Sequence, residues 1–263
     1  MNVTEYQQHL AVENKYILHD IELVEPIAKG HDLLVEVKAN SVNTTDYKVR
    51  LGVPEDDWKV IGWDTAGIVK AVGEQVTLFK PGDKVWYAVD ITRPVNNAEM
   101  QLIDERIAGA MPQTLSFNDA TILSLSSNTE WEILFDRLQV SKVDVNKNIL
   151  LIGAVGSVGS IIIKLLKEFT NLTIVASTSR PETVSWLKEL GVDHIVNDDK
   201  KLSEEFIAQN LSPVDYVVSL HNTESQLIEI EKVLKAQGQL AITDSPKTLD
   251  IAVFKSKAIS VHW

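Results

Sequence analysis

A glycine-rich segment near the middle of the chain has the spacing of a phosphate-binding loop. Gly153, Gly156 and Gly159 follow the apolar run 148–152 directly and precede a helical pattern. Backbone N–H groups at a helix N-terminus bind a pyrophosphate, and a Cβ atom in the turn would block its approach. The strand–turn–helix context therefore predicts a dinucleotide site. Its expected residues are Gly153, Gly156, Ser157, Val158 and Gly159. The alternative is a structural turn in which Gly159 permits close packing of helix on strand.

The residues after the next expected strand indicate which dinucleotide binds. An NAD site places Asp or Glu about 20 residues beyond the glycine motif, where it binds the ribose 2′-hydroxyl. This chain has Ala176-Ser-Thr-Ser-Arg-Pro181 there, without a carboxylate. Arg180 can pair with a 2′-phosphate, and Ser177 and Ser179 can donate hydrogen bonds to it. Pro181 suits the first position of a helix. We therefore expect NADP(H), with a solvated surface charge as the alternative interpretation of Arg180.

Composition excludes several other kinds of chemistry. The 263 residues include no cysteine, which rules out disulfides, thiolate nucleophiles and Cys-ligated zinc. The net charge is −12 without a basic cluster, so neither a nucleic acid nor an anionic membrane is an expected partner. The N-terminus has no basic segment followed by an apolar one, and the longest uncharged stretch, 148–163, is too short to span a bilayer. We expect a cytoplasmic protein.

The first part of the chain has the pattern of a β-rich domain. Apolar and charged residues alternate from Leu33 within 31–39, and similar runs occupy 68–72 and 84–89. The last of these follows Pro81-Gly-Asp83, a strong turn signal. No convincing amphipathic helix occurs before about residue 112. We assign residues 1–115 to this domain.

Beyond Ser116 the pattern changes to alternating strands and helices. Ser116 is a plausible helix N-cap, with Asp119 in the first turn. Short β-branched runs predict strands at 148–152, 173–176, 194–196, 215–220 and 239–243, and 259–261 begins a sixth. Between them we expect a helix with Ile161, Leu165 and Phe169 on one face. Another helix should be opened by the capping box Thr223–Gln226. This order predicts an α/β doubly wound parallel sheet over 116–263.

Several motifs, in order along the chain, carry a resemblance to a known family. They are Ser41-Val-Asn-Thr-Thr-Asp46, Gly62-Trp-Asp-Thr-Ala-Gly67 with its continuation to Gly73, Phe79-Lys-Pro-Gly-Asp-Lys-Val85, Asn97-Ala-Glu-Met-Gln-Leu102 and the glycine loop. The chain resembles the medium-chain dehydrogenase/reductase superfamily, and within it the quinone oxidoreductase and zinc-free "zinc-type alcohol dehydrogenase-like" branch. The resemblance implies a GroES-like β domain, a Rossmann domain and a nicotinamide bound in the cleft between them. It also implies a homodimer formed through edge strands of the Rossmann sheets.

The same resemblance suggests how catalysis proceeds. Zinc-dependent relatives have Cys, His and Glu where this chain has Asn43, Trp63 and Asp64. Without zinc to polarise an alcohol, we expect reduction of an activated acceptor, a quinone or an α,β-unsaturated carbonyl. Asn43 is the first candidate donor to the acceptor oxygen and Lys48 the second. Asp46 either orients them or only ends a turn.

Two further expectations concern the cofactor and the completeness of the chain. By resemblance, Thr129 contacts the nicotinamide end. The family has a C-terminal segment that returns to the β domain, and we expect this chain to lack it. A catalytically impaired relative that binds NADPH without turnover is therefore the alternative function. An S-adenosylmethionine methyltransferase is disfavoured, because it requires an acidic residue after its second strand.

Overall fold

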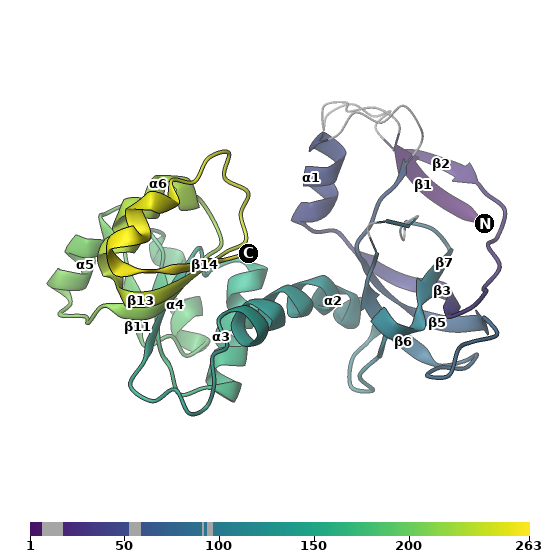
Figure 1. The fold of residues 1–263 in the computed structure, drawn as a ribbon. Helices are drawn as coiled ribbons and strands as arrows, with labels where there is room; N and C mark the ends of the chain where they lie inside the picture. The colour runs from purple at the N-terminus through teal and green to yellow at the C-terminus, as the bar shows by residue number, and fades with distance from the viewer. Residues whose placement is uncertain (7–17, 53–58, 91, 94–96) are drawn as a thin grey trace. The chain divides into compact units, whose positions relative to one another are not determined.

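A computed structural model describes residues 1–6, 18–52, 59–90, 92–93 and 97–263. The chain divides into two compact units, Met1–Leu125 and Ser126–Trp263, each with a hydrophobic core of its own. Helix α2 (Phe117–Trp131) spans this division (Figure 1), and the boundary expected from the sequence lies just before it. No helix in the described part of the chain has the length and apolar composition needed to cross a membrane.

The described residues of the first unit form two β-sheets. The larger has the strand order β7-β3-β5-β6-β8, with every neighbouring pair antiparallel. The smaller has the order β2-β1-β4. The larger sheet consists of β3 (Asp32–Ser41), β5 (Asp64–Val72), β6 (Lys84–Ala88), β7 (Met100–Asp104) and β8 (Gly109–Ala110). The smaller consists of β1 (Asn2–Tyr6), β2 (His19–Glu22) and β4 (Lys59–Val60). The prediction of a β-rich first domain is confirmed.

Apolar residues of the strands form the core of this unit, and the turn before β6 has the predicted form. Gly82 has a φ of 95°, and the Asp83 N–H donates to the Lys80 carbonyl. The core includes Leu33 and Val35 of β3, Val69 of β5 and Trp63, which is 4% exposed. The unit also contains helix α1 (Thr44–Gly52), so the expectation of no helix before residue 112 was wrong.

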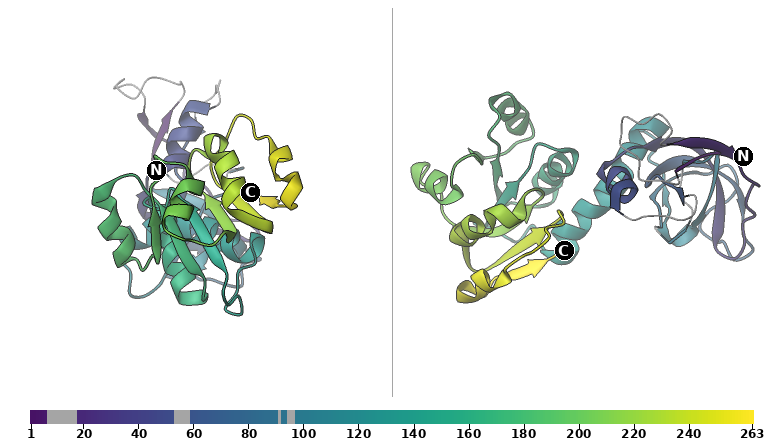
Figure 2. Two further views of the ribbon diagram at one scale, coloured as in Figure 1. Left: turned by 90° about the vertical axis from the view of Figure 1, so that its left-hand side faces the viewer. Right: turned by 90° about the horizontal axis from the view of Figure 1, so that it is seen from above.

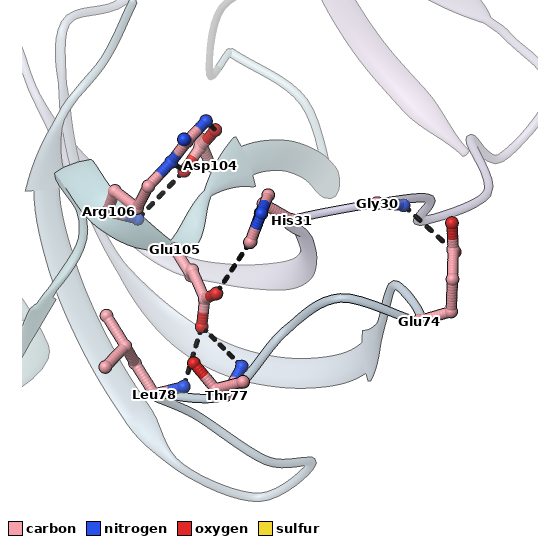
Figure 3. A network of polar contacts seen from close by, with 8 residues as sticks. All are labelled: Gly30, His31, Glu74, Thr77, Leu78, Asp104, Glu105 and Arg106. Carbon is pink, nitrogen blue, oxygen red and sulfur yellow. Dashed lines mark hydrogen bonds and ion pairs between the residues drawn. The ribbon is translucent and has the colours of Figure 1, made fainter.

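At one end of the larger sheet, a buried carboxylate is hydrogen-bonded to the loops around it (Figure 3). Glu105 opens the 3-10 helix Glu105–Ile107 and is 2% exposed. It accepts hydrogen bonds from the backbone N–H groups of Thr77 at 2.9 Å and Leu78 at 2.7 Å. Its other oxygen lies 2.9 Å from Nδ1 of His31. Burial by itself would raise the pKa of Glu105, but these hydrogen bonds and the His31 charge outweigh it and lower the pKa. The carboxylate thus joins three segments that are distant in sequence.

The second unit is a six-stranded parallel sheet with the order β11-β10-β9-β12-β13-β14. Its strands are β9 (Asn148–Ile152), β10 (Thr173–Ser177), β11 (His194–Val196), β12 (Val214–Ser219), β13 (Leu234–Ile242) and β14 (Ser260–His262). All six strands lie where the sequence predicts them, although β13 begins earlier. Strands β9 and β12 lie in the middle of the sheet, with β10 and β11 on one side and β13 and β14 on the other, as in a doubly wound Rossmann fold. The predicted fold class is confirmed.

Helices cover both faces of this parallel sheet (Figures 1 and 2). Alternate residues of β9 point to opposite faces: Ile149 and Leu151 belong to one core cluster, and Leu150 and Ile152 to the other. The first cluster includes residues of α3 (Ser157–Phe169), α4 (Pro181–Glu189) and the π-helix Glu132–Arg137. The second includes residues of α5 (Leu202–Ala208), α6 (Thr223–Val233) and the 3-10 helix Ile251–Lys257. Because both faces are buried, the strands are almost continuously apolar.

Two helices differ from the sequence expectation in detail. The buried face of α3 consists of Gly159, Ile162, Ile163 and Leu166, whereas Phe169, on the expected face, is 38% exposed. The expected capping box of α6 is not formed. Asn222 occupies the N-cap position, and the Thr223 hydroxyl donates to Asp244 at 2.5 Å.

The N-cap of α2 is as predicted, because the Asp119 N–H donates to the Ser116 hydroxyl at 3.2 Å.

Candidate functional site

The glycine loop connects β9 to α3 at the point where the strand order reverses. Gly153 follows β9 with a φ of 78°, in the left-handed region that disfavours other residues. A Cβ atom on Gly153 would lie 3.3 Å from Cβ of His221, which follows the neighbouring strand β12. In a parallel sheet, the carboxyl ends of the two strands flanking the reversal form the crevice in which ligands bind. The loop therefore lies at the expected position for a dinucleotide.

The start of α3 leaves its N–H groups available. Gly156 is the N-cap residue, and no side chain caps the helix. The first N–H groups of a helix have no partner within it, so those of Ser157, Val158 and Gly159 are free of intrahelical bonds. A Cβ on Gly156 would meet no atom within 4 Å, which leaves this side of the loop open. These features fit a pyrophosphate.

Gly159 has a separate role. A Cβ atom at this position would lie 2.3 Å from the carbonyl oxygen of Ala154, which is a severe clash with backbone. The close approach of α3 to the end of β9 therefore requires glycine here. This agrees with the packing interpretation of Gly159, whereas Gly156 faces open space.

The end of β10 carries the residues expected to contact the adenosine ribose. Ser177 is fully buried, and its hydroxyl donates to Oδ2 of Asp198 at 3.1 Å. Ser179 is partly buried. Arg180 is exposed and is the N-cap residue of α4, whose first position is Pro181, as the sequence predicts. Within the described ranges, the Arg180 guanidinium forms no ion pair. Arg180 is thus available to an anionic ligand, while the hydroxyl of Ser177 is already engaged.

In the first unit, Asn43 and Asp46 form the capping box of α1. The Asn43 side-chain oxygen accepts the Thr45 N–H at 2.7 Å, and Asp46 Oδ2 accepts the Asn43 N–H at 2.8 Å. This reciprocal pattern satisfies N–H groups at the start of the helix. Asp46 is 5% exposed, and its pKa is raised mainly by burial and, in addition, by the nearby Asp64 charge. The hydrogen bond from the Asn43 N–H opposes this shift.

Asp64 accepts hydrogen bonds from two other segments of the first unit, Asn43 and the adjacent residues Ser124 and Leu125 of α2. It is 2% exposed at the start of β5. Its Oδ2 accepts a hydrogen bond from the Asn43 side-chain amide at 2.6 Å. Its Oδ1 accepts bonds from the Ser124 hydroxyl and the Leu125 N–H, both at 2.6 Å. The Asn43 amide group is therefore held in a fixed orientation, and only one of its two N–H bonds is used by Asp64.

Two further candidates are Lys48 and Thr129. Lys48 is exposed on α1 and, within the described ranges, forms no ion pair with a carboxylate. Thr129 lies on α2 in the second unit and is partly buried. The structure thus brings together Asn43, Asp46 and Asp64 but not Lys48.

Sequence reasoning overlooked Ser124 and Asp198. Ser124 donates to Asp64 from a position 60 residues away, which no local pattern reveals. Asp198 carried a usable signal, because it follows the short strand β11 closely, and side chains beyond the carboxyl ends of parallel strands line ligand crevices.

Comparison with known proteins agrees with these features. Residues 29–123 match the alcohol dehydrogenase GroES-like domain. The chain is 31% identical over 264 aligned residues to a zinc-type alcohol dehydrogenase-like protein of Staphylococcus aureus, covering 99% of this chain and 78% of that protein. It is also 32% identical to the 2-methylene-furan-3-one reductase of Solanum lycopersicum, over 68% of this chain and 48% of the reductase.

Solved structures of related proteins share the fold. A candidate zinc-dependent alcohol dehydrogenase from Rhizobium etli superposes with a TM-score of 0.93 at 46% identity, covering 100% of this chain and 78% of the other. The Escherichia coli quinone oxidoreductase, solved in complex with NADPH, superposes with a TM-score of 0.82 at 19% identity, over 99% of this chain and 80% of the other. The chain therefore belongs to the medium-chain dehydrogenase/reductase superfamily of oxidoreductases, with a GroES-like domain followed by a Rossmann domain.

Proposed function

We propose that this protein is an NADPH-dependent reductase of quinones or α,β-unsaturated carbonyl compounds that works without a metal ion. The observation that carries the proposal is the uncapped N-terminus of α3 behind a glycine loop at the reversal of strand order. Gly153, Gly156 and the N–H groups of Ser157, Val158 and Gly159 would hold the pyrophosphate. Arg180 would pair with the 2′-phosphate, and Thr129 would contact the nicotinamide end by analogy with the family.

The side chains in the positions of the family's zinc ligands do not suit zinc. Asn43 donates its amide to Asp64, and Trp63 belongs to the hydrophobic core of the first unit. Asp64 accepts three hydrogen bonds, and its carboxylate neighbour, Asp46, accepts the N–H of Asn43. Within the described ranges, no three His, Cys, Asp or Glu side chains are grouped so that they could hold a metal ion. This donor set supports chemistry that relies on hydrogen bonds alone.

A conjugated acceptor suits such a site. Reduced nicotinamide, when bound, supplies the hydride. The acceptor's carbonyl oxygen gains negative charge as the hydride arrives, and a fixed hydrogen-bond donor stabilises that charge. The amide of Asn43 is held by Asp64 and retains one N–H for this purpose. Lys48 is the second candidate donor. Asp46 fixes Asn43 through the capping box and acts as a positioning residue. The names of the tomato reductase and the bacterial quinone oxidoreductase support this substrate class.

The cofactor assignment is tested by Arg180→Ala. A charge-assisted hydrogen bond contributes about 1.5–3 kcal/mol, so Arg180 should tighten NADPH binding relative to NADH by that amount. The variant should lose most of the preference for NADPH, measured as dissociation constants by fluorescence titration. Lys188→Ala on the same helix is the matched control, since Lys188 is also exposed. Equal affinities of the unmutated protein for NADPH and NADH would contradict the assignment.

The reaction is tested by NADPH oxidation with a panel of quinones, enones and simple alcohols. We expect turnover with at least one quinone or enone, and no NADP⁺ reduction by the alcohols. NADPH binding without turnover on any conjugated acceptor would instead support the impaired, cofactor-binding relative. Alcohol oxidation would show that the substrate class is wrong.

A further inference from the structure

A carboxylate lies beside the end of β10, where the sequence alone shows none. Strands β10 and β11 are parallel, with Ser177 paired to Val196, so their carboxyl ends lie side by side at the same edge of the sheet. Asp198 follows β11 and accepts the hydroxyl hydrogen bond of Ser177 at 3.1 Å. The carboxylate is therefore held next to the last residue of β10, although it is 21 residues away in sequence.

The loop that carries Asp198 is fixed by its own hydrogen bonds. The Asn197 N–H donates to Glu205 at 3.1 Å, and the Asn197 side-chain oxygen accepts the Asp199 N–H at 2.9 Å. The Lys200 N–H closes the turn by donating to the Asn197 carbonyl at 3.3 Å. Asp198 is only partly exposed. These contacts keep its carboxylate at the strand end.

Asp198 and Arg180 both carry charges that the described part of the chain leaves without an opposite partner. Within those ranges, Asp198 forms no ion pair, and its Oδ1 accepts no hydrogen bond. Arg180 begins the helix that follows β10 and is likewise not ion-paired there. The two side chains do not pair with each other. One cationic and one anionic group thus lie near the end of β10, each able to act on a ligand there.

We propose that Asp198 is a specificity-determining residue for the cofactor, acting against Arg180. Its carboxylate accepts a hydrogen bond from a free ribose 2′-hydroxyl and repels a 2′-phosphate. The preference for NADPH is then smaller than Arg180 alone would produce, and NADH remains a usable ligand. This inference rests on the proposed dinucleotide site. Asp198, after β11, adds a second selectivity residue to those of the segment after β10.

The negative charge of Asp198 and its partly exposed position determine how strongly it affects binding of a 2′-phosphate. A carboxylate a few ångströms from a phosphate, at a partly exposed position, changes affinity by about tenfold. A hydroxyl group, in contrast, gains an acceptor. Neutral asparagine at this position still accepts the Ser177 hydrogen bond through its side-chain oxygen, so Asp198→Asn removes the charge with little effect on the loop.

The test compares 2′,5′-ADP with 5′-ADP by isothermal titration calorimetry. Asp198→Asn should tighten binding of 2′,5′-ADP about tenfold and leave 5′-ADP unchanged or slightly weaker. Asp199→Asn is the matched control, because Asp199 is a neighbouring exposed carboxylate and only its backbone N–H is hydrogen-bonded within the described ranges. The control should shift the ratio of the two affinities less than about twofold. Asp198→Ser is a second neutral variant, to be used if Asp198→Asn folds poorly as judged by circular dichroism.

The possible outcomes separate this inference from the proposed function. If both nucleotides bind and the ratio is the same in Asp198→Asn and the unmutated protein, Asp198 has no role in selectivity while the dinucleotide site stands. If Asp199→Asn shifts the ratio as much as Asp198→Asn, the effect is long-range charge and the assignment to Asp198 is wrong. If the unmutated protein binds neither nucleotide, the proposed function and this inference both fail.

Discussion

Asn43 combines a structural and a proposed chemical role in one side chain. Its oxygen caps α1, and its amide nitrogen donates to the buried Asp64. The sequence identified Asn43 and Asp46 as candidates for chemistry, but it did not reveal that they form a capping box. An N-cap and a catalytic amide use the same residue type, so sequence alone cannot separate the two roles.

Asn43→Ser separates them experimentally. Serine is as good an N-cap as asparagine, so the cap is kept, and the lost amide hydrogen bond to the buried Asp64 should lower the free energy of unfolding by about 1–3 kcal/mol. Serine has one hydroxyl hydrogen in place of the two amide N–H bonds, however, so it cannot donate to Asp64 and to an acceptor at the same time. We expect the kcat for quinone or enone reduction to fall by about 10²-fold, the usual effect of removing a donor to a developing oxyanion. Steady-state kinetics and urea unfolding measure the two effects. Unchanged kcat would show that Asn43 only caps the helix.

Ser177 illustrates the limit of residue-level prediction at the cofactor site. The sequence motif offers its hydroxyl to a 2′-phosphate, but in the structure the hydroxyl is buried and bonded to Asp198. The partner belongs to another strand, and its proximity results from the pairing of β10 with β11. The position of Pro181 at the start of α4 was predictable because the chemistry of a helix start is local, whereas the pairing of Arg180 with a 2′-phosphate stays a prediction.

At the scale of elements, prediction succeeded where the signal was local and failed where packing decides. The strands 148–152 and 194–196 have the predicted bounds, because β-branched runs end at turn residues. The face of α3 was misassigned because Ile161, Ile162 and Ile163 are consecutive, which leaves the helix phase open. The contact of Gly159 with Ala154 fixes that phase and turns Ile162 and Ile163 inward.

Helix α1 was missed for a related reason. Its sequence TTDYKVRLG is largely polar, and its few apolar residues show no periodicity long enough to indicate a helix. Instead, its start is determined by the capping box and by the attachment of Asn43 to Asp64. A local capping box and one tertiary contact together therefore define the start of this helix.

Glu105 gives the larger sheet of the first unit a dependence on pH. Because its pKa is lowered in the folded protein, its contribution to stability is present above the unfolded pKa of about 4.3. That contribution is lost as the pH falls through the folded value. The sign follows from linkage: the unfolded state binds the proton first, so acid favours unfolding.

Glu105→Gln should therefore loosen the segment around Thr77 and Leu78 at pH 7, because the charged acceptor of both N–H groups is lost. Amide hydrogen exchange of these residues should be faster than in the unmutated protein, and the difference should shrink as the pH falls below about 4. Glu182→Gln, at an exposed position on α4, is the control and should leave exchange here unchanged. Equal exchange rates at pH 7 in the variant and the unmutated protein would contradict the role assigned to Glu105.

At the scale of the whole molecule, the two units have different architectures, and each carries candidate residues of its own kind. The first is antiparallel and holds its polar cluster around one buried carboxylate, Asp64. The second is parallel and leaves a helix N-terminus free at a strand reversal. The candidate groups of the first unit are therefore mostly side chains, and those of the second unit are mostly backbone N–H groups. This difference explains why the glycine loop was recognisable from sequence, whereas the partners of Asp64 were not.

Whether the protein binds zinc depends on all of the possible ligands in the chain. The chain has no cysteine, and the resemblance to zinc-dependent relatives implies that Asn43 and Trp63 stand at two of three ligand positions. The third, Asp64, already accepts hydrogen bonds from Asn43, Ser124 and Leu125, so a cation would have to displace these donors to reach its oxygens. Purified protein should therefore contain far less than one zinc per chain by elemental analysis. Incubation with a chelator should leave quinone or enone turnover within experimental error of the untreated protein. Stoichiometric zinc that is removed together with the activity would show that the protein uses a metal after all, and that Asp64 rearranges to bind it.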